Sequence, residues 1–266
     1  MRKLLILVLI SFLLVCSLFS ETIHPKLKNV VLKLKIRGFS EKEISQIFSD
    51  SRLTIYRDIR SLKRKKIDYF ERSFGLFSSD SLQRGRNFIK AHLEILSQAE
   101  KEFGIPKEII VAILRIESNF GSFLGERVLI NTFYSRILLD IKRVDAEEEL
   151  VQFLVMCRQI GLGDVFALKG SYMGAFGLPQ FLPSSFLRYA LDGNKDGKVD
   201  LFSYEDAIFS VANYLKKKGF GGSFYDQIDA LKKYNDSKEY ALAVLVYAFL
   251  LKEKKNKDGT YITQKY

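Results

Sequence analysis

Cysteine and histidine are both scarce in this chain of 266 residues, which narrows the chemistry it can perform. The cysteines are Cys16 and Cys157, and the histidines are His24 and His92. A histidine-based zinc site or a Ser-His-Asp triad therefore has few residues to draw on, which argues against most peptidase and amidase mechanisms. Once an N-terminal segment carrying Cys16 is removed, one thiol remains and no internal disulfide can form. Glycine and proline are not in excess, and no internal repeat is present, so an ordinary globular chain is expected.

Residues 1–20 are typical of an export signal. Two positive residues near the start precede residues 4–19, a run of sixteen residues without a charge. That run is shorter than the roughly 20 residues that span a bilayer, although a retained membrane anchor stays an alternative. Cleavage after Ser17 or Ser20 and lipidation of Cys16 are both open. We therefore expect an exported protein of the periplasm or cell envelope, with membrane anchoring through a lipidated Cys16 as one form.

A net charge of +11 indicates an anionic partner, such as a cell-wall polymer, a lipid or a nucleic acid. Much of the positive charge lies in residues 63–66, 216–218 and 252–257. The alternative is that these lysines are solvated at helix ends and in a tail, where they need no partner. No nucleic-acid-binding motif accompanies the charge, so a nucleic acid is not expected.

Apolar residues recur mostly at helical spacing, and no segment alternates with a period of two. We therefore expect a mainly α fold. Ser40 and Glu43 match a capping box, and Pro106 suits the first position of a helix. The sequence predicts helices over residues 27–70, 82–103, 107–117, 124–160, 204–217 and 238–252. After the signal, residues 21–266 form the expected catalytic region, with a helical N-terminal part 21–100, a core 101–250 and a basic tail 251–266.

Glu117 is the most informative single residue. Ile110, Ile113 and Glu117 stand on one face of a helix, so the carboxylate continues an apolar stripe. Burial disfavours the charged form of a carboxyl group, which allows it to stay protonated near neutral pH and to act as an acid. The alternative is an ordinary ion pair, with Arg115 or Arg127 as partner, or a solvated helix end.

Residues 170–181 combine closely spaced glycines with polar side chains. Glycines let the backbone approach a ligand, while Ser171 and Gln180 offer hydrogen bonds. The segment lacks the Gly-Lys-Ser/Thr ending of a phosphate-binding loop, so nucleotide binding is not expected. Read alone, the segment is better explained as a structural turn.

Residues 192–198 match the first seven positions of an EF-hand calcium loop. Asp192, Asn194 and Asp196 supply oxygens at positions 1, 3 and 5, and Lys198 supplies a carbonyl at position 7. The glutamate expected at position 12 is absent, but Asp206 three residues further on could replace it. Alternatively, Asp206 forms a capping box with the serine before it and the loop is a tight polar turn.

Taken in order, these segments resemble the membrane-bound lytic murein transglycosylase B family. The resemblance covers roughly residues 80–250. The matching stretches are 103–110, 116–121, 170–185, 192–206, 210–214, 234–235 and Tyr240.

The resemblance implies a lysozyme-like transglycosylase fold, with an EF-hand-like loop, that cleaves the MurNAc–GlcNAc bond of peptidoglycan. In the family, the glutamate at the position of Glu117 protonates the glycosidic oxygen, and the sugar's own 6-hydroxyl then attacks to leave a 1,6-anhydro-MurNAc end. The sugar groove is lined at positions matching Ser171, Gln180, Tyr214, Tyr234, Asn235 and Tyr240. Structural calcium is implied at Asp192, Asn194, Asp196, Lys198 and Asp206. No organic cofactor is implied, the partner is the glycan strand, and a monomer is expected.

The acid-free segment 170–180 agrees with a mechanism in which the substrate supplies its own nucleophile, since most glycosidases need a second carboxylate. Two alternatives remain, a hydrolytic muramidase and a non-catalytic, calcium-stabilised peptidoglycan-binding module. An acid facing Glu117 would favour the first, and an exposed Glu117 the second. Family members often place an upstream tyrosine in the cleft, where this chain has Arg72 or Phe74 with Tyr69 nearby, and no role is assigned there.

Overall fold

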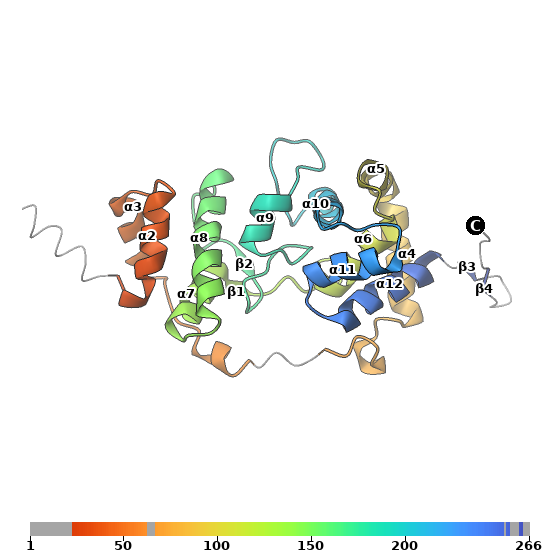
Figure 1. The fold of residues 1–266 in the computed structure, drawn as a ribbon, viewed down its shortest axis with the longest axis horizontal. Helices are drawn as coiled ribbons and strands as arrows, with labels where there is room; N and C mark the ends of the chain where they lie inside the picture. The colour runs from red at the N-terminus through yellow and green to blue at the C-terminus, as the bar shows by residue number, and fades with distance from the viewer. Residues whose placement is uncertain (1–22, 63–66, 253, 256–260, 263–266) are drawn as a thin grey trace, which may run out of the picture. The chain divides into compact units, whose positions relative to one another are not determined.

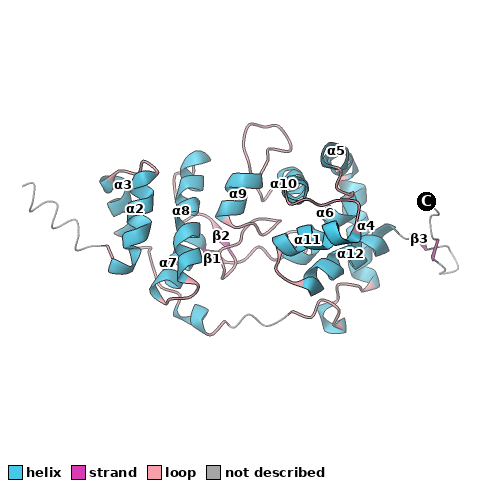
Figure 2. Ribbon diagram, viewed as in Figure 1, coloured by secondary structure: helices cyan, strands magenta, loops and turns pink. Residues whose placement is uncertain are grey.

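The structure, a computed structural model, describes residues 23–62, 67–252, 254–255 and 261–262. The predicted signal 1–20 with Cys16, and most of the tail 251–266, lie outside the described residues. As predicted, regular structure is mainly α-helical (Figure 2). The chain divides into two compact units, residues 1–63 with 126–174 and residues 64–125 with 175–266. Each unit is thus built from two separate stretches of chain, and the boundaries expected near residues 20, 100 and 250 stay a prediction.

The first unit is a small helical cluster. Its described elements are η1 Pro25–Leu27, α2 Lys28–Ile36, α3 Glu41–Phe48, η2 Arg57–Arg60, β1 Arg127–Val128, α7 Leu129–Leu138, α8 Arg143–Gln159 and β2 Lys169–Gly170. Helix α8 packs against both α7 and α2, and α2 is drawn beside it in Figure 1. Leu34 of α2 is fully buried, and the rings of Phe133 and Phe153 lie 6.1 Å apart in the core between α7 and α8. The two strands pair antiparallel, with Arg127 opposite Gly170.

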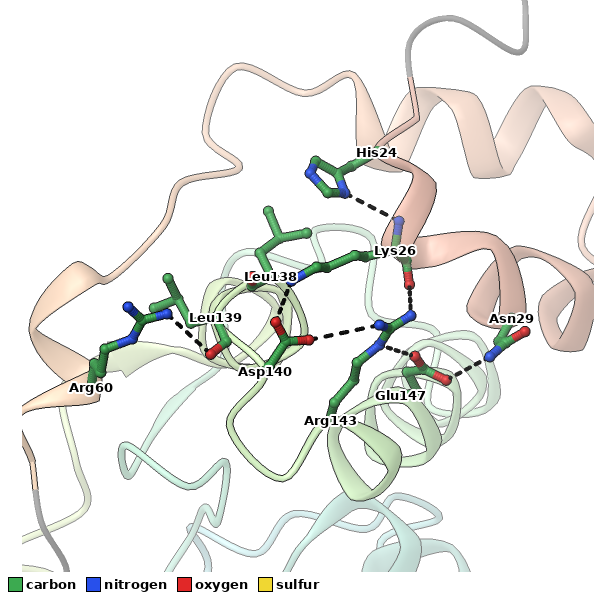
Figure 3. A network of polar contacts seen from close by, with 9 residues as sticks. All are labelled: His24, Lys26, Asn29, Arg60, Leu138, Leu139, Asp140, Arg143 and Glu147. Atoms are coloured by element: carbon green, nitrogen blue, oxygen red, sulfur yellow. Dashed lines mark hydrogen bonds and ion pairs between the residues drawn. The ribbon is translucent and has the colours of Figure 1, made fainter.

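A polar network fastens the start of this unit to the turn between α7 and α8 (Figure 3). Lys26 donates a 2.8 Å hydrogen bond to the carbonyl of Leu138 and pairs with Asp140. Arg143 donates to Glu147 and to the carbonyl of Lys26, at 2.7 and 3.2 Å. Asp140 has a φ of 56°, a conformation that persists where surrounding contacts hold it.

The prediction that residues 27–70 are helical is wrong in part. Helices α2 and α3 lie within it, and α3 begins with the predicted capping box of Ser40 and Glu43. Residues 51–56, however, contain no helix. There, the amides of Thr54 and Tyr56 donate to the side chains of Asn131 and Ser135 on α7, at 3.2 and 2.8 Å. Tertiary hydrogen bonds thus replace the helical ones that the spacing of apolar residues predicted.

The second unit contains the remaining helices, with α6 at its centre. Its described elements are η3 Arg72–Phe74, α4 Ser79–Ala91, α5 Leu93–Phe103, α6 Lys107–Ser118, α9 Pro183–Tyr189, α10 Tyr204–Lys217, α11 Phe224–Tyr234, α12 Lys238–Lys252, β3 Lys254–Lys255 and β4 Tyr261–Ile262. Helix α6 contacts α4, α5, α10 and α12. The whole apolar run from Ile109 to Leu114 is therefore buried.

Helix boundaries in this unit follow the sequence closely in places and depart from it in others. Helices α10 and α12 begin and end where they were predicted, and α6 extends one residue beyond Glu117. Pro106 is the residue before the helix rather than its first residue, since its ψ of 132° is not helical. Helices α9 and α11 were not predicted, because the glycine-rich and polar texture of their surroundings resembles loop.

Among the described residues, no helix combines the length and the apolarity needed to cross a membrane.

Candidate active site

Glu117 lies in the last turn of α6, at the end of the apolar stripe formed by Ile110 and Ile113. Solvent reaches part of the residue, but its carboxyl group is enclosed by protein, and burial raises its pKa to about 7. The Tyr240 hydroxyl lowers that pKa by a smaller amount. A group with this pKa is protonated in about half of the molecules at neutral pH, as a general acid requires.

The ion-pair alternative for Glu117 is not what the structure shows. Arg115 donates a 2.9 Å hydrogen bond to Ser81, and Arg127 pairs with Asp58 in the first unit. Within the described part of the second unit, burial and Tyr240 are what set the pKa of Glu117, and no cation or second carboxylate contributes.

Tyrosine rings gather beside Glu117. Tyr240 is fully buried in α12, and its ring stacks on that of Tyr234 with centroids 6.2 Å apart. Tyr214 of α10 meets Tyr234 edge-on at 4.8 Å. Burial raises the pKa of all three hydroxyls, and the charge of Glu117 raises those of Tyr234 and Tyr240 further. Three residues predicted as sugar-binding are thus brought together with the predicted acid.

The Tyr240 hydroxyl is buried and faces the Glu117 carboxyl, whose pKa it lowers by a hydrogen-bonding interaction, and no other partner for it is found among the described residues. The Tyr234 hydroxyl, by contrast, donates to the Pro179 carbonyl at 2.6 Å. Of the two, Tyr240 therefore interacts directly with the acid, while Tyr234 bonds to the segment before Gln180.

Tyr69 is a neighbour of this cluster to which the sequence assigned no role. It is buried, and its ring meets that of Tyr240 edge-on at 5.8 Å and that of Phe74 at 5.6 Å. The ring contact with Tyr240 joins residues 171 positions apart in the chain, so no local pattern could reveal it. The resemblance offered the one available sign, a tyrosine expected upstream.

Gln180 lies in the same unit as Glu117 and closes a tight turn. It has a φ of 49°, and its side-chain nitrogen Nε2 donates hydrogen bonds to the carbonyls of Gly177 and Leu124, at 2.9 and 3.4 Å. Phe176 and Phe181 pair their backbones across this turn. Both bonds are donated by Nε2, so the side-chain oxygen of Gln180 takes no part in them.

The two other predicted sugar contacts lie at chain bends. Asn235 is half-buried at the end of α11, with extended backbone, one residue after Tyr234. Ser171 belongs to the first unit, where its hydroxyl accepts a 3.3 Å hydrogen bond from the Met173 amide. Asn235 is therefore grouped with the tyrosines, whereas Ser171 is placed within its own unit.

The predicted calcium loop folds around its own carboxylates. Asp192 accepts from the amides of Asp196 and Gly197, at 3.1 and 2.8 Å, and Asn194 accepts from Asp196 at 3.0 Å. Gly197 has a φ of 86°, as the sixth position of such a loop requires. Lys198 donates its amide to Asp196 at 2.8 Å.

Asp206 turns into this loop from the first turn of α10. It is buried, and it accepts from the amides of Gly193 and Asp200 at 2.8 and 2.7 Å. Burial raises its pKa, and the charge of Asp192 adds to the increase. Ser203 caps the helix through the Asp206 amide, but the Asp206 carboxylate faces the loop and does not complete a capping box.

Among the described residues, no three His, Cys, Asp or Glu side chains gather closely enough to hold a metal ion by themselves. A site in this loop would therefore depend on Asn194 and on carbonyl oxygens besides its carboxylates. Such mixed oxygen ligands are what Ca²⁺ accepts.

Comparison with known proteins finds similarity to transglycosylases. Residues 22–224 match the model of the transglycosylase SLT domain family. The membrane-bound lytic murein transglycosylase B of Escherichia coli K12 is 37% identical over 142 residues, which are 53% of this chain and 39% of that protein. The chain thus matches well under half of that relative's length.

Solved structures of lytic transglycosylases have a fold similar to that of this chain. A soluble lytic transglycosylase from Pseudomonas aeruginosa is 26% identical with a TM-score of 0.75, covering 86% of this chain and 98% of that one. A lytic transglycosylase of Escherichia coli in complex with calcium has the same TM-score at 22% identity, covering 85% of this chain and 92% of that one. Because the family model covers most of the chain, this protein belongs to the transglycosylase SLT domain family.

Proposed function

We propose that this protein is a peptidoglycan lytic transglycosylase with Glu117 as its single catalytic acid and base. The observation that carries the proposal is the enclosed carboxyl of Glu117, with a pKa of about 7, beside a cluster of tyrosine rings. The family and the Escherichia coli relative supply the substrate class, the glycan strand of peptidoglycan.

In the proposed reaction, neutral Glu117 gives its proton to the oxygen that joins MurNAc C1 to GlcNAc. As that C1–O bond breaks, the 6-hydroxyl oxygen of the same MurNAc forms a bond to C1, and its proton passes to the Glu117 carboxylate. No water is consumed, and the acid is regenerated. Intramolecular attack is favoured because the nucleophile is already attached to the reacting sugar.

One carboxyl group is enough for this mechanism, whereas hydrolysis by an ordinary glycosidase needs two. Glu117 alone can therefore supply both the acid and the base of the transglycosylase reaction. A non-catalytic binding module is less favoured, because it would be indicated by an exposed Glu117, whereas the Glu117 carboxyl is enclosed.

The tyrosines and amides supply the proposed sugar groove. Aromatic faces pack against the CH faces of sugar rings, and Gln180 and Asn235 offer hydrogen-bonding groups for hydroxyl and acetamide positions. We propose that sugar contacts are made by Ser171, Gln180, Tyr214, Tyr234, Asn235 and Tyr240.

We also propose a structural Ca²⁺ in the loop that contains Asp192 and Asp206. The residues fit this ion, since burial and, to a smaller extent, the charge of Asp192 raise the pKa of Asp206, so that a cation between the two carboxylates would be favourable. A Cβ added to Gly193 would lie 2.4 Å from the Glu205 carbonyl, so the loop closes tightly on the start of α10. Asn194, Asp196 and the Lys198 carbonyl would complete the oxygen ligands. Bound calcium would neutralise this charge and stabilise the loop, with no part in bond cleavage.

The place of action proposed is the periplasm or cell envelope, after export directed by residues 1–20. Anchoring through a lipidated Cys16, and a monomeric state, are parts of the same proposal. Export and anchoring are supported by the sequence of the signal and by the membrane-bound description of the Escherichia coli relative.

Product analysis tests the function directly. Purified sacculi are digested with the protein, and the released muropeptides are weighed by mass spectrometry. Products with 1,6-anhydro-MurNAc ends are expected, whereas products heavier by one water, with reducing ends, would replace the proposal with the muramidase. Release of no fragments at all would favour the binding module.

A further inference from the structure

The turn that follows Glu117 has an unusual backbone. Asn119, Phe120 and Gly121 have successive φ angles of 50°, 57° and 89°, and only glycine adopts this region freely. The Phe120 amide donates to the Leu114 carbonyl at 3.2 Å, which ends α6 abruptly. Such a strained sequence of angles persists only where other contacts hold it. Those contacts therefore also fix Glu117, which lies two residues before the turn.

Helix α4 holds this turn at two points. Arg84 donates a 2.9 Å hydrogen bond from Nη1 to Oδ1 of Asn119. Four residues along, the ring of Phe88 stacks on that of Phe120 with centroids 4.7 Å apart. Residues four apart share one face of a helix, so a single face of α4 contacts both non-glycine residues of the strained turn.

Arg84 is itself oriented by α4. Its Nε lies 3.1 Å from Oδ2 of Asp80, in an ion-pair contact that lacks hydrogen-bond geometry. The buried Nε therefore has no hydrogen-bond partner among the described residues. The guanidinium thus lies between Asp80 and Asn119, with Nη1 directed to Asn119.

Arg84 does not act on Glu117 through its charge. The pKa of Glu117 is set by burial and by Tyr240, with no contribution from Arg84. Any influence of Arg84 on the acid must therefore pass through the position of the turn and of the end of α6.

We infer that Arg84 and Asn119 form a positioning pair that holds the Glu117 carboxyl at its place in the active site. The inference rests on the proposed function and adds to it two positioning residues, which act on Glu117 through the end of α6. Small displacements of a catalytic group lower the rate of the chemical step steeply, because the reactive geometry is narrow.

Two substitutions at one position give the main test. Asn119→Gly removes the acceptor but permits the positive φ, so the helix end can still form. Asn119→Asp keeps an oxygen for Arg84. On a soluble peptidoglycan fragment, we expect Asn119→Gly to lower kcat by about tenfold with KM unchanged. Asn119→Asp should restore kcat to within about twofold of wild type, which a role in stability alone would not predict.

A variant on the same helix serves as the control. Gln83 is exposed and donates to Asn87, so Gln83→Ala removes one hydrogen bond from α4 without touching the turn. Its kcat should equal that of wild type. A loss of kcat in this control as large as in Asn119→Gly would overturn the inference, since any weakening of α4 would then suffice.

A second variant keeps the test independent of Asn119. Arg84→Met retains the apolar stem and removes the donor, so it should lower kcat as Asn119→Gly does, and the double variant should lose no more than either single one. Additive losses, or wild-type kcat in Asn119→Gly, would overturn the inference while leaving the proposed function intact. Failure of the wild-type protein to cleave would instead overturn the proposed function and the inference with it.

Discussion

At the scale of single residues, the proposed chemistry depends on how the protein surrounds one carboxyl group. Glu117 combines an enclosed carboxyl, a raised pKa and a buried tyrosine hydroxyl beside it. Replacing it by glutamine keeps its volume and hydrogen-bonding capacity but removes the transferable proton.

Glu117→Gln should therefore lower cleavage of sacculi by at least about a thousandfold while the protein still folds and binds glycan. The measurement is the rate of muropeptide release by purified protein, with binding followed separately by sedimentation with sacculi. Glu102→Gln, in an exposed position on α5, is the matched control and should keep full activity. Appreciable cleavage by Glu117→Gln would rule out the proposed mechanism.

The raised pKa of Glu117 also predicts how stability changes with pH. Between about 4.5, the ordinary pKa of a glutamate, and about 7, the folded state keeps a proton that the unfolded state has lost. The contribution of Glu117 to stability is therefore complete below about 4.5 and is lost as pH rises through about 7. The loss amounts to roughly 3 to 4 kcal/mol at most, since one unit of pKa corresponds to about 1.4 kcal/mol.

Thermal unfolding of wild type and Glu117→Gln in a chelator, compared from about pH 5 to about pH 8, measures this effect. Because glutamine does not titrate, the variant should gain stability relative to wild type as pH rises. A constant difference between the two melting temperatures would show that the Glu117 pKa is not raised in the folded protein.

How far the sequence predicted these residues depends on how local their causes are. The burial of Glu117 follows from its spacing to Ile110 and Ile113 on one helix, and the structure confirms that Ile110 and Ile113 are buried. The contacts of Tyr69 with Tyr240 and of Arg84 with Asn119 join distant segments, so periodicity could not reveal them.

At the scale of elements, amphipathic or wholly buried helices such as α6, α10 and α12 were predictable, because their apolar residues follow the helical period. Helices α9 and α11 are short or lie in glycine-rich and polar surroundings, where composition favours loops. Residues 51–56 show the opposite error, since helical spacing was present but side chains of α7 satisfy the backbone instead.

The loop before α10 is predicted to bind calcium and to be stabilised by it. Millimolar calcium should raise the melting temperature relative to a chelator, because an ion that binds only the folded state stabilises it. Asp206→Asn should abolish that increase, since it removes the buried carboxylate that faces Asp192. Asp236→Asn, an exposed position outside the loop, should leave it unchanged.

An equal melting temperature of the wild-type protein in chelator and in calcium would exclude a structural calcium site. A calcium response that survives in Asp206→Asn would move the site away from this loop. Neither result would bear on the role of Glu117.

At the scale of the whole molecule, the net charge of +11 is the property that no single element explains. Peptidoglycan strands carry carboxylate groups on their peptides, so a positive protein is attracted to them before specific contacts form. The alternative is that lysines such as Lys216 and Lys217, in the last turn of α10, only interact favourably with the helix dipole. The two explanations differ in what they predict for binding and for stability.

If the charge contributes to substrate binding, sedimentation of the Glu117→Gln protein with sacculi should fall several-fold between about 50 and 500 mM salt, because salt screens exposed charges. Adding Lys216→Gln and Lys217→Gln should weaken binding at the lower salt and reduce this dependence, with little change in melting temperature. Both lysines are exposed, whereas Lys218 contacts the rings of Tyr189 and Tyr214 and is left intact so that the tyrosine cluster is undisturbed. Unchanged binding together with a lower melting temperature would assign these lysines to the helix end alone. Binding to the glycan would then depend on the groove residues beside Glu117, with no contribution from these two charges.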